Sequence, residues 1–512
     1  MLKTESYKKG IVKSTALNIV AKSIGFINSL ILAFYFGASA STDIYFYVLS
    51  VAALITNTVN GIDYLVLIPE AMKLRETKGE KSSQQFLNFF IWLYAAIGIL
   101  ITIFIVLSPV LFFNLFSKFD RSQLQDHSQL LYIGCIIIVF QLLNNLMSAI
   151  LVSYKYFTMP IITGLVNSIF AITLTLVFHK QLGITGTILG ISAGYVVNFI
   201  LLLVQLKKYH GWEFLKVHVV KVKRVWRNIG LIQVNILPVW IRNYIILYLL
   251  SGLGTGIITS VNLGQMLATM PEIFILTQIT SVVGIKFSEL AAKEDYKETS
   301  RVLSNVLSTL FVLLIPVAIA MAVAHKEIIA IVFQRGHFTA SSAATTAFCF
   351  FYFALILPSK IYDVTFTRLF TSFQVYGLST LAAVIGHSII TVITFFAIKQ
   401  FNLTGYFISI MIGYYIIMPV ISLFVLHFGL KKMDTKAVVK SFLIALITIP
   451  AVFFLCNYLY QLLHFHYIVN IGIISIVSLV SVLVICNYTM NLEYFWTSVR
   501  QMRRRLKLLL HK

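Results

Sequence analysis

Long apolar runs recur along the whole 512-residue chain, and they constrain the fold more than any other feature. Each run has about 20 residues, the length that an α-helix needs to cross roughly 30 Å of hydrocarbon. Charged residues make up only 11% of the chain, whereas soluble domains average about 25%. Within a bilayer, a helix satisfies its own backbone hydrogen bonds. The sequence therefore predicts an all-α polytopic membrane protein.

We expect about 14 transmembrane helices, arranged as two parallel six-helix bundles plus two C-terminal helices. The first run has no small-residue cleavage site, so we interpret it as part of the body rather than a signal peptide. The expected limits are 11–37, 44–69, 86–112, 129–152, 160–179, 184–206, 228–252, 258–285, 302–324, 340–362, 375–398, 402–427, 438–460 and 467–489.

The net charge of +22 comes mostly from basic residues in alternate loops. The positive-inside rule places these loops and both termini in the cytoplasm. This distribution favours a bacterial cytoplasmic (inner) membrane protein over a nucleic-acid-binding protein. We expect anionic membrane lipids at the basic face and a monomeric protein. The basic stretches are 3–13, 73–81, 207–227, 286–301, 431–440 and 500–512.

The chain also contains an internal repeat. HKQLGITG at 179–186 resembles IKQFNLTG at 398–405, which gives an offset of 219 residues (399 − 180). LFSKF at 115–119 similarly matches VFQRG at 332–336. An even number of spans in each copy makes the copies parallel, a common arrangement in transporters. The predicted parts are a bundle at 1–206, an amphipathic basic linker at 207–227, a bundle at 228–430, two further helices at 431–490 and a basic tail at 491–512.

The sequence contains no recognisable catalytic constellation. Neither GxSxG nor HExxH occurs, and the four cysteines lack metal-ligand spacing. His464 and His466 form an isolated pair that is more typical of a solvated turn than of a metal site. We therefore predict no enzyme activity, catalytic residue, metal or cofactor. A monovalent cation or the membrane potential is the candidate energy source.

Ionisable side chains inside the apolar runs are the main candidate functional residues, because burying a charge in a bilayer is costly. Lys22 and Arg242 lie near the predicted cytoplasmic ends of their helices, so each either snorkels to the interface or lines a cavity. Asp63 and Glu272 lie deeper, which favours a cavity or an ion pair. Pro271 sits beside Glu272 and predicts either a hinge or a packing bend.

Two motifs resemble those of a known family. FGA at 36–38, followed by Thr42 and Asp43, is similar to the FGA…TDAFF signature of the MurJ/MviN lipid II flippases. VFQRGHFT at 332–339 is similar to the family's LFERGAFT element. The predicted arrangement of six, six and two helices also matches this family of the multidrug/oligosaccharidyl-lipid/polysaccharide exporter superfamily.

The resemblance implies a flippase with a cavity lined by segments one, two, seven and eight. It also implies that segments thirteen and fourteen hold a lipid tail. The family's two first-helix arginines fall at Lys22, which keeps the charge, and at Asn28, which does not. Its segment-two arginines fall near Asn57, and its segment-eight arginine falls near Met266. These differences favour a lipid-linked saccharide bound partly through amides.

The predicted function is therefore the flipping of a polyprenyl-(pyro)phosphate-linked saccharide, for peptidoglycan or a surface polysaccharide, by alternating access. A MATE-like ion-coupled exporter is the first alternative, and a membrane glycan polymerase is the second. Short outer loops with few charges disfavour the polymerase. The site residues have four expected roles. Lys22 and Arg242 bind the (pyro)phosphate, and Asn28, Asn57 and Gln265 contact sugar or peptide. Asp43 and Pro271 belong to the gate, and Asp63 or Glu272 couples transport to ions.

Overall fold

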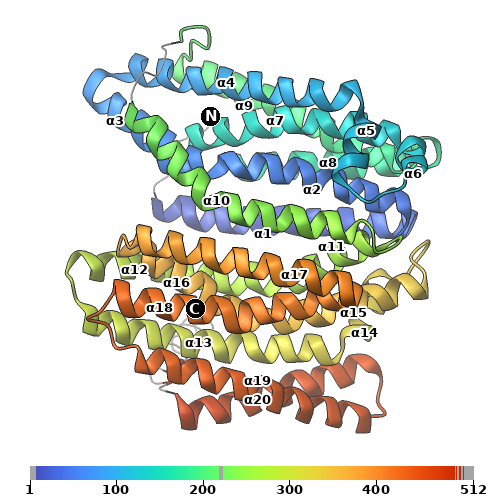
Figure 1. Cartoon of the computed structure of the whole chain (residues 1–512), viewed down its shortest axis with the longest axis vertical. Helices are drawn as coiled ribbons and strands as arrows, with labels where there is room; N and C mark the ends of the chain where they lie inside the picture. Colours follow the sequence, from blue (N-terminus) through green and yellow to red (C-terminus); the bar gives the residue numbers. More distant parts are fainter. Residues whose placement is uncertain (1–6, 218–222, 491, 493–494, 497–499, 501–512) are drawn as a thin grey trace, which may run out of the picture. The chain divides into compact units, whose positions relative to one another are not determined.

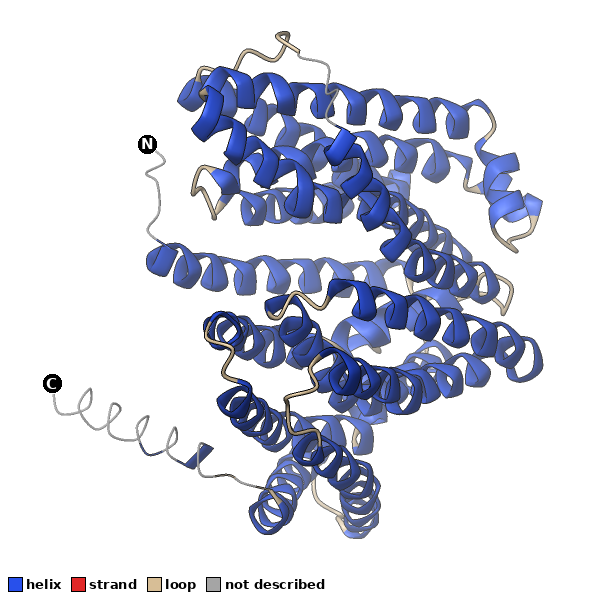
Figure 2. Ribbon diagram, turned by 60° about the vertical axis from the view of Figure 1, so that its left-hand side comes forward, coloured by secondary structure: helices blue, strands red, loops and turns tan. Residues whose placement is uncertain are grey.

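The computed structural model describes residues 7–217, 223–490, 492, 495–496 and 500, and these form helices and loops without a β-strand (Figure 2). The chain divides into two units. Unit 1 comprises Met1–Ser260 and Phe333–Ser342, and unit 2 comprises Val261–Val332 and Ala343–Lys512. Part of the predicted linker and most of the predicted basic tail lie outside the described residues.

Unit 1 is built around α7, the most buried of its spans. α2, α4 and α9 pack against α7, and α1 packs against α8 (Figure 1). The elements of unit 1 are α1 (Tyr7–Phe36), α2 (Ala40–Ile62), η1 (Asp63–Leu67), α3 (Ile68–Lys78), α4 (Glu80–Leu107), α5 (Pro109–Phe116), α6 (Arg121–Asp126), α7 (Ser128–Ser153), α8 (Met159–Leu182), α9 (Thr185–His210), α10 (Lys223–Leu250) and the first turn of α11 (Ile257–Ala268).

Unit 2 is built around α13, the most buried span, which packs against α19 and α20 (Figure 1). Its core is a continuous apolar cluster that extends from Leu276 to Leu492 in the sequence. The elements are the rest of α11, η2 (Glu272–Leu276), α12 (Thr277–Ala292), α13 (Tyr296–Val323), α14 (His325–Phe333, of which Phe333 belongs to unit 1), α15 (Ala340–Ile356, of which the first three residues belong to unit 1), η3 (Leu357–Ser359), α16 (Lys360–Ser372), α17 (Tyr376–Ile412), η4 (Gly413–Ile417), α18 (Met418–Gly429), α19 (Lys436–Leu462) and α20 (Tyr467–Thr489).

Thirteen runs of helix among the described residues are long and apolar enough to cross a membrane. One of them, Tyr376–Gly429, has 54 residues, more than twice the length that one span needs. Its backbone is not helical at Asn402, where φ is 51° and ψ is −132°. This break lies at the predicted boundary between 375–398 and 402–427, so the long run contains two of the expected spans. The predicted all-α polytopic fold is confirmed.

The two halves of the predicted repeat share a local backbone conformation. Gly183, at the end of α8, has φ 55° and ψ −141°, close to the values of Asn402, 219 positions later (402 − 183). Thr175 and Thr394, which differ by the same offset, are both fully buried and donate to the carbonyl four residues earlier. The aligned sequences therefore adopt the same helix–break–helix geometry.

Short π-helical segments interrupt three of the spans, at η1, η2 and η4. Each lies next to a proline: Pro69 and Pro419 follow η1 and η4, and Pro271 directly precedes η2. Proline has no N–H and clashes with the carbonyl four residues earlier, so Pro69 and Pro419 disturb the helical hydrogen bonding of Leu65 in η1 and of Tyr415 in η4. Asp63 and Glu272 are the first residues of η1 and η2, which places both predicted intramembrane carboxylates at irregular backbone.

Candidate functional site

Asp43 lies in the first turn of α2 and is almost fully buried. Its carboxylate accepts hydrogen bonds from the backbone N–H of Gly256 (2.5 Å) and of Thr259 (2.8 Å), and from the Thr259 hydroxyl (2.7 Å). These donors belong to the start of α11, where N–H groups have no partner within the helix. The Asp43 side chain therefore caps a helix that lies more than 200 residues away in the sequence.

The turn before α2 is fixed by its own sequence. Ser39 caps α2 through a reciprocal pair of bonds with Thr42, and Gly37 provides a positive φ of 62°. The Thr42 hydroxyl also lies 3.0 Å from the Thr259 hydroxyl. Thr42 thus contributes both to its own helix start and to the Asp43 cap.

The two motifs that carried the family resemblance contact each other in unit 1. The backbone N–H of His337 donates to the Phe34 carbonyl at 2.9 Å. A Cβ on Gly37 would overlap the His337 carbonyl, and a Cβ on Gly336 would overlap the Phe34 carbonyl. Both glycines also have positive φ. We call this arrangement of 34–43, 256–259 and 336–337 the Asp43 lock.

Asn28 lines a polar cavity of about 330 Å³ inside unit 1. The other polar side chains of the cavity come from α7, α8 and α9: Gln141, Asn167, Ser168 and Tyr195. Among the described residues, no charged side chain lines it. The cavity is thus uncharged but rich in hydrogen-bonding groups.

The amides around this cavity form a partly satisfied network. Asn198 donates to the Asn167 side-chain oxygen at 2.6 Å, and Asn167 in turn bonds the Tyr195 hydroxyl. Asn28 bonds the Tyr45 hydroxyl, whereas the Asn28 Oδ1 atom is buried without a hydrogen-bond partner among the described residues. An unsatisfied buried acceptor is costly, so this position favours a ligand or water that donates a hydrogen bond.

The intramembrane carboxylates have different surroundings. Asp63 is buried in unit 1 and accepts a hydrogen bond from the Tyr94 hydroxyl at 2.7 Å. Glu272 is half-buried in unit 2, where it acts electrostatically on Lys360. Lys360 donates to the Tyr414 hydroxyl at 3.1 Å and lies over the Tyr414 ring. Neither carboxylate is in a metal-binding cluster of the described residues.

The remaining predicted site residues are more exposed. Lys22 on α1 and Asn57 on α2 are exposed in unit 1, and Gln265 on α11 is exposed in unit 2. Arg242 is half-buried on α10 and donates to the side chain of Asn243 at 3.3 Å. Pro271 lies directly before η2.

The sequence interpretation missed the partners of these residues. Gln141, Asn167 and Tyr195 are uncharged residues within ordinary apolar runs, and Tyr94 is a single tyrosine on α4. Helical spacing from Asn28 cannot identify them, because they lie on other helices. The recurrence of amides in α7, α8 and α9 was the available signal.

Comparisons with known proteins agree with this fold. A model of the family described as lipid II flippase MurJ matches residues 32–480. A probable lipid II flippase MurJ of Buchnera aphidicola subsp. Schizaphis graminum is 23% identical over 350 residues, which are 65% of this chain. The chain spans 66% of the length of that relative.

Solved structures show the same architecture. A lipid II flippase MurJ in an inward closed conformation gives a TM-score of 0.74 at 18% identity, over 93% of this chain and 99% of that one. An inward-facing MATE multidrug transporter of the MOP superfamily gives 0.58 at 14% identity, over 82% and 94%. The predicted family and the prediction of a transporter rather than an enzyme are confirmed. Because the family model covers most of its length, the chain belongs to the lipid II flippase MurJ family of multi-pass membrane proteins, which serves peptidoglycan biosynthesis.

Proposed function

We propose that this protein moves a polyprenyl-(pyro)phosphate-linked saccharide, such as lipid II, from the cytoplasmic to the outer leaflet by alternating access. Family membership supports the transport of a lipid-linked precursor. The positive-inside distribution of the basic loops supports cytoplasmic termini in a bacterial inner membrane.

The uncharged polar cavity around Asn28 is the observation that carries this proposal. Its volume of about 330 Å³ suits a sugar-sized group, and its amides and hydroxyls both donate and accept. Asn28 lines the cavity, and its buried Oδ1 atom has no hydrogen-bond partner among the described residues, so a small rotation of the side chain would let it accept from a sugar hydroxyl. Because no charged side chain among the described residues lines the cavity, it favours the neutral glycan over a cationic drug.

Lys22 and Arg242 are the proposed contacts for the (pyro)phosphate. Both are cations of unit 1 within apolar spans, where anionic ligands are the natural partners of Lys and Arg. Asn57 and Gln265 are exposed and remain candidate contacts for sugar or peptide. Asp63 or Glu272 is the proposed residue that couples transport to a monovalent cation or to the membrane potential.

The Asp43 lock is the proposed outer gate. Its three hydrogen bonds join the first turns of α2 and α11, so opening at this end of unit 1 requires that they break. Hydrogen bonds between two helix starts can break without exposing a large apolar surface. Pro271 and η2 supply irregular backbone on the same span as α11, which suits a bend during opening.

Reconstituted transport of a fluorescent polyprenyl-diphosphate disaccharide tests these roles. Asn28→Leu and Asn167→Leu should each lower the initial rate about tenfold, because a buried sugar hydroxyl loses its partner. Asn114→Leu, which changes an exposed residue on α5 outside the cavity, should not.

The phosphate contacts are tested in the same assay. Lys22→Ala and Arg242→Ala should raise the substrate concentration needed for half-maximal rate, whereas Lys208→Ala, at the end of α9, should leave it unchanged. Full transport by both Lys22→Ala and Arg242→Ala would show that the phosphate binds elsewhere.

A further inference from the structure

Asp63 is an acidic side chain in the interior of unit 1, within the span Ala40–Lys78. Its exposed fraction is 1%, and that of Tyr94, which lies against it, is 4%. Ten residues (73 − 63), or about 15 Å of helix, separate Asp63 from Lys73 in the sequence. A carboxyl at this depth is costly unless it has a partner or a function, so its surroundings decide which of the two applies.

One of the two Asp63 oxygens has a hydrogen-bond partner and the other does not. The Tyr94 hydroxyl of α4 donates to the Oδ1 atom at 2.7 Å. The Oδ2 atom is buried without a hydrogen-bond partner among the described residues. The backbone N–H groups of Asp63 and Ile68 are used within the helix, by the carbonyls of Val59 and Asp63. The carboxyl therefore has an open oxygen in an apolar environment.

The elements around Asp63 bring no cation into an ion pair with it. α2, α3, α7 and α10 contact η1, and α7 carries no Asp, Glu, Lys, Arg or His. Arg224 of α10 pairs with Glu70 of α3 at 2.6 Å. Among the described residues, no basic side chain forms an ion pair with Asp63. The titratable groups that face it are two tyrosines, Tyr94 and the exposed Tyr64.

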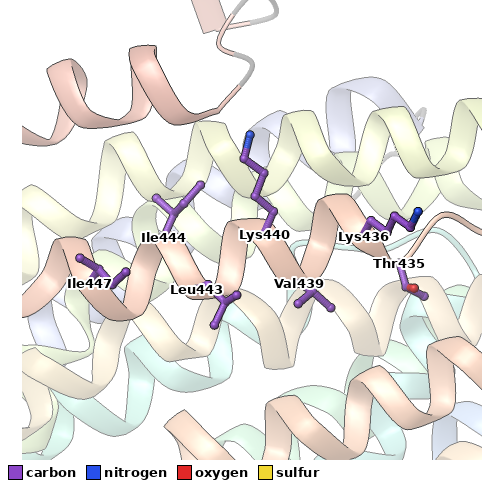
Figure 3. A pocket seen from close by; sticks show the side chains of 7 residues that line it. All are labelled: Thr435, Lys436, Val439, Lys440, Leu443, Ile444 and Ile447. Atoms are coloured by element: carbon purple, nitrogen blue, oxygen red, sulfur yellow. The ribbon is translucent and has the colours of Figure 1, made fainter.

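Two arrangements in unit 2 show how charged groups of this chain are compensated. Figure 3 shows Lys436 and Lys440 at the start of α19, where a hollow of about 420 Å³ opens along the helix. Both lysines are exposed, so water or the membrane interface can solvate their charges. Glu272 is half-buried and acts electrostatically on the cation Lys360. Asp63 has neither kind of compensation.

A bound proton removes the charge of Asp63 with the smallest change in its surroundings. An isolated carboxylate in an apolar environment loses its solvation, and the usual outcome is neutralisation. A metal cation is less suitable, because hard cations are held by several oxygen ligands. Among the described residues, the Tyr94 hydroxyl is the single side-chain group that hydrogen-bonds the carboxyl. As a neutral acid, Asp63 accepts from Tyr94 through Oδ1 and carries its proton on Oδ2.

Asp63 is also the first residue of the π-helical segment η1, which Pro69 follows. Such segments within α-helices are frequent at functional sites. A change from π-helical to α-helical hydrogen bonding would turn the carboxyl about the helix axis by up to about 100°, the angle of one residue. An ionised Asp63 therefore has a route out of its apolar surroundings.

We propose that Asp63 is a reversible proton-binding site, that it carries a proton on Oδ2 in this conformation, and that this proton is the ion coupled to transport. Asp63 takes the proton from water on one side of the membrane and returns it to water on the other side, after η1 has turned the carboxyl. The coupling role rests on the proposed flipping of a lipid-linked saccharide, whereas the protonation of Asp63 does not. Glu272 then serves as a counter-ion of Lys360 and does not bind the coupled ion.

Infrared spectroscopy of the purified full chain tests the protonation without any substrate. At neutral pH, wild-type protein should show a carbonyl band of a protonated carboxyl that is absent in Asp63→Asn, which has nearly the same shape. Tyr94→Phe should keep this band and shift it, since the hydrogen bond to Oδ1 is lost. Asp126→Asn is the matched control, because it changes an exposed acid on α6, and it should keep the wild-type band. Identical bands in wild type and Asp63→Asn would overturn the site.

Reconstituted transport under an imposed pH gradient tests the coupling. For wild type and Asp126→Asn, the steady-state ratio of polyprenyl-diphosphate disaccharide between the leaflets should change by up to about tenfold per pH unit, the factor that one proton per cycle supplies. For Asp63→Asn, the ratio should be the same at every gradient, while exchange of labelled substrate without a gradient continues. Equal responses of Asp63→Asn and wild type would overturn the coupling role. If wild type moves no disaccharide but shows the Asp63 band, the proposed function is contradicted and the proton site is supported.

Discussion

At the residue scale, Asp43 and Asn28 show what a single polar side chain does in an apolar protein. Asp43 satisfies N–H groups that the start of α11 cannot satisfy internally, and its negative charge lies at the positive end of that helix. Asn28 does the opposite, because it leaves one buried acceptor open. The first arrangement joins two helix starts, and the second leaves a buried acceptor without a hydrogen bond.

Asp43→Asn should destabilise the protein by about 1–2 kcal/mol, because the amide loses the negative charge and turns a donor towards one of the N–H groups. Thermal unfolding of the purified protein measures this effect. Asp126→Asn, at the exposed end of α6, removes the same charge without removing a cap and should change little. Equal melting temperatures for the two variants would show that the cap contributes nothing.

The sequence indicated the importance of single residues better than their partners. Asp43 and Asn28 stand out because polar residues are rare within apolar runs. The donors to Asp43 lie at 256–259, and the other cavity amides lie on α7, α8 and α9. Such pairings depend on how helices pack, which hydropathy and helical spacing do not determine.

At the element scale, glycines allow the turn after α1 and the turn after α14 to interlock. Gly37 and Gly336 each face a backbone carbonyl of the other segment, with no room for a Cβ atom. This packing gives a physical reason for a glycine in each of the two family motifs. The repeat supplies a second case, in which Gly183 and Asn402 adopt the same unusual backbone.

Gly336→Ala should cost about 3 kcal/mol or more, since it combines a positive φ with a clash against the Phe34 carbonyl. Gly211→Ala is the matched control. Gly211 has nearly the same φ, 56° against 58°, but no atom within 4 Å of the added Cβ. Gly211→Ala should cost only about 1 kcal/mol. The difference in unfolding free energy between the two variants therefore measures the cost of the clash with the Phe34 carbonyl. Similar losses of unfolding free energy in both variants would mean that the contact between the turns after α1 and after α14 contributes little to stability.

Asn402→Gly should stabilise unit 2 by about 1 kcal/mol, because glycine adopts φ 51° with ψ −132° more readily than asparagine does. The equivalent position in the first copy is already Gly183. Gly183→Asn should be destabilising by a similar amount. Chemical denaturation of both variants measures these changes, and a loss of stability in Asn402→Gly would contradict the equivalence of the two turns.

At the scale of the whole molecule, composition and hydropathy sufficed to predict the fold. The apolar runs predicted the spans, including the boundary at Asn402 that divides the longest helical run. Helix breaks within spans, such as η1 and η2, were predictable only as bends at prolines. The basic loops, the repeat and the two family motifs together indicated a flippase, and the family model agrees.

The movement of a lipid-linked precursor to the outer leaflet is the central claim. Its most direct test uses living cells depleted of this protein, with a membrane-impermeant probe that labels only outer-leaflet polyprenyl-linked saccharide. The outer-leaflet pool should fall while total precursor rises, and wild-type protein should restore both. An outer-leaflet pool that persists or grows on depletion would contradict the account and indicate a step after translocation.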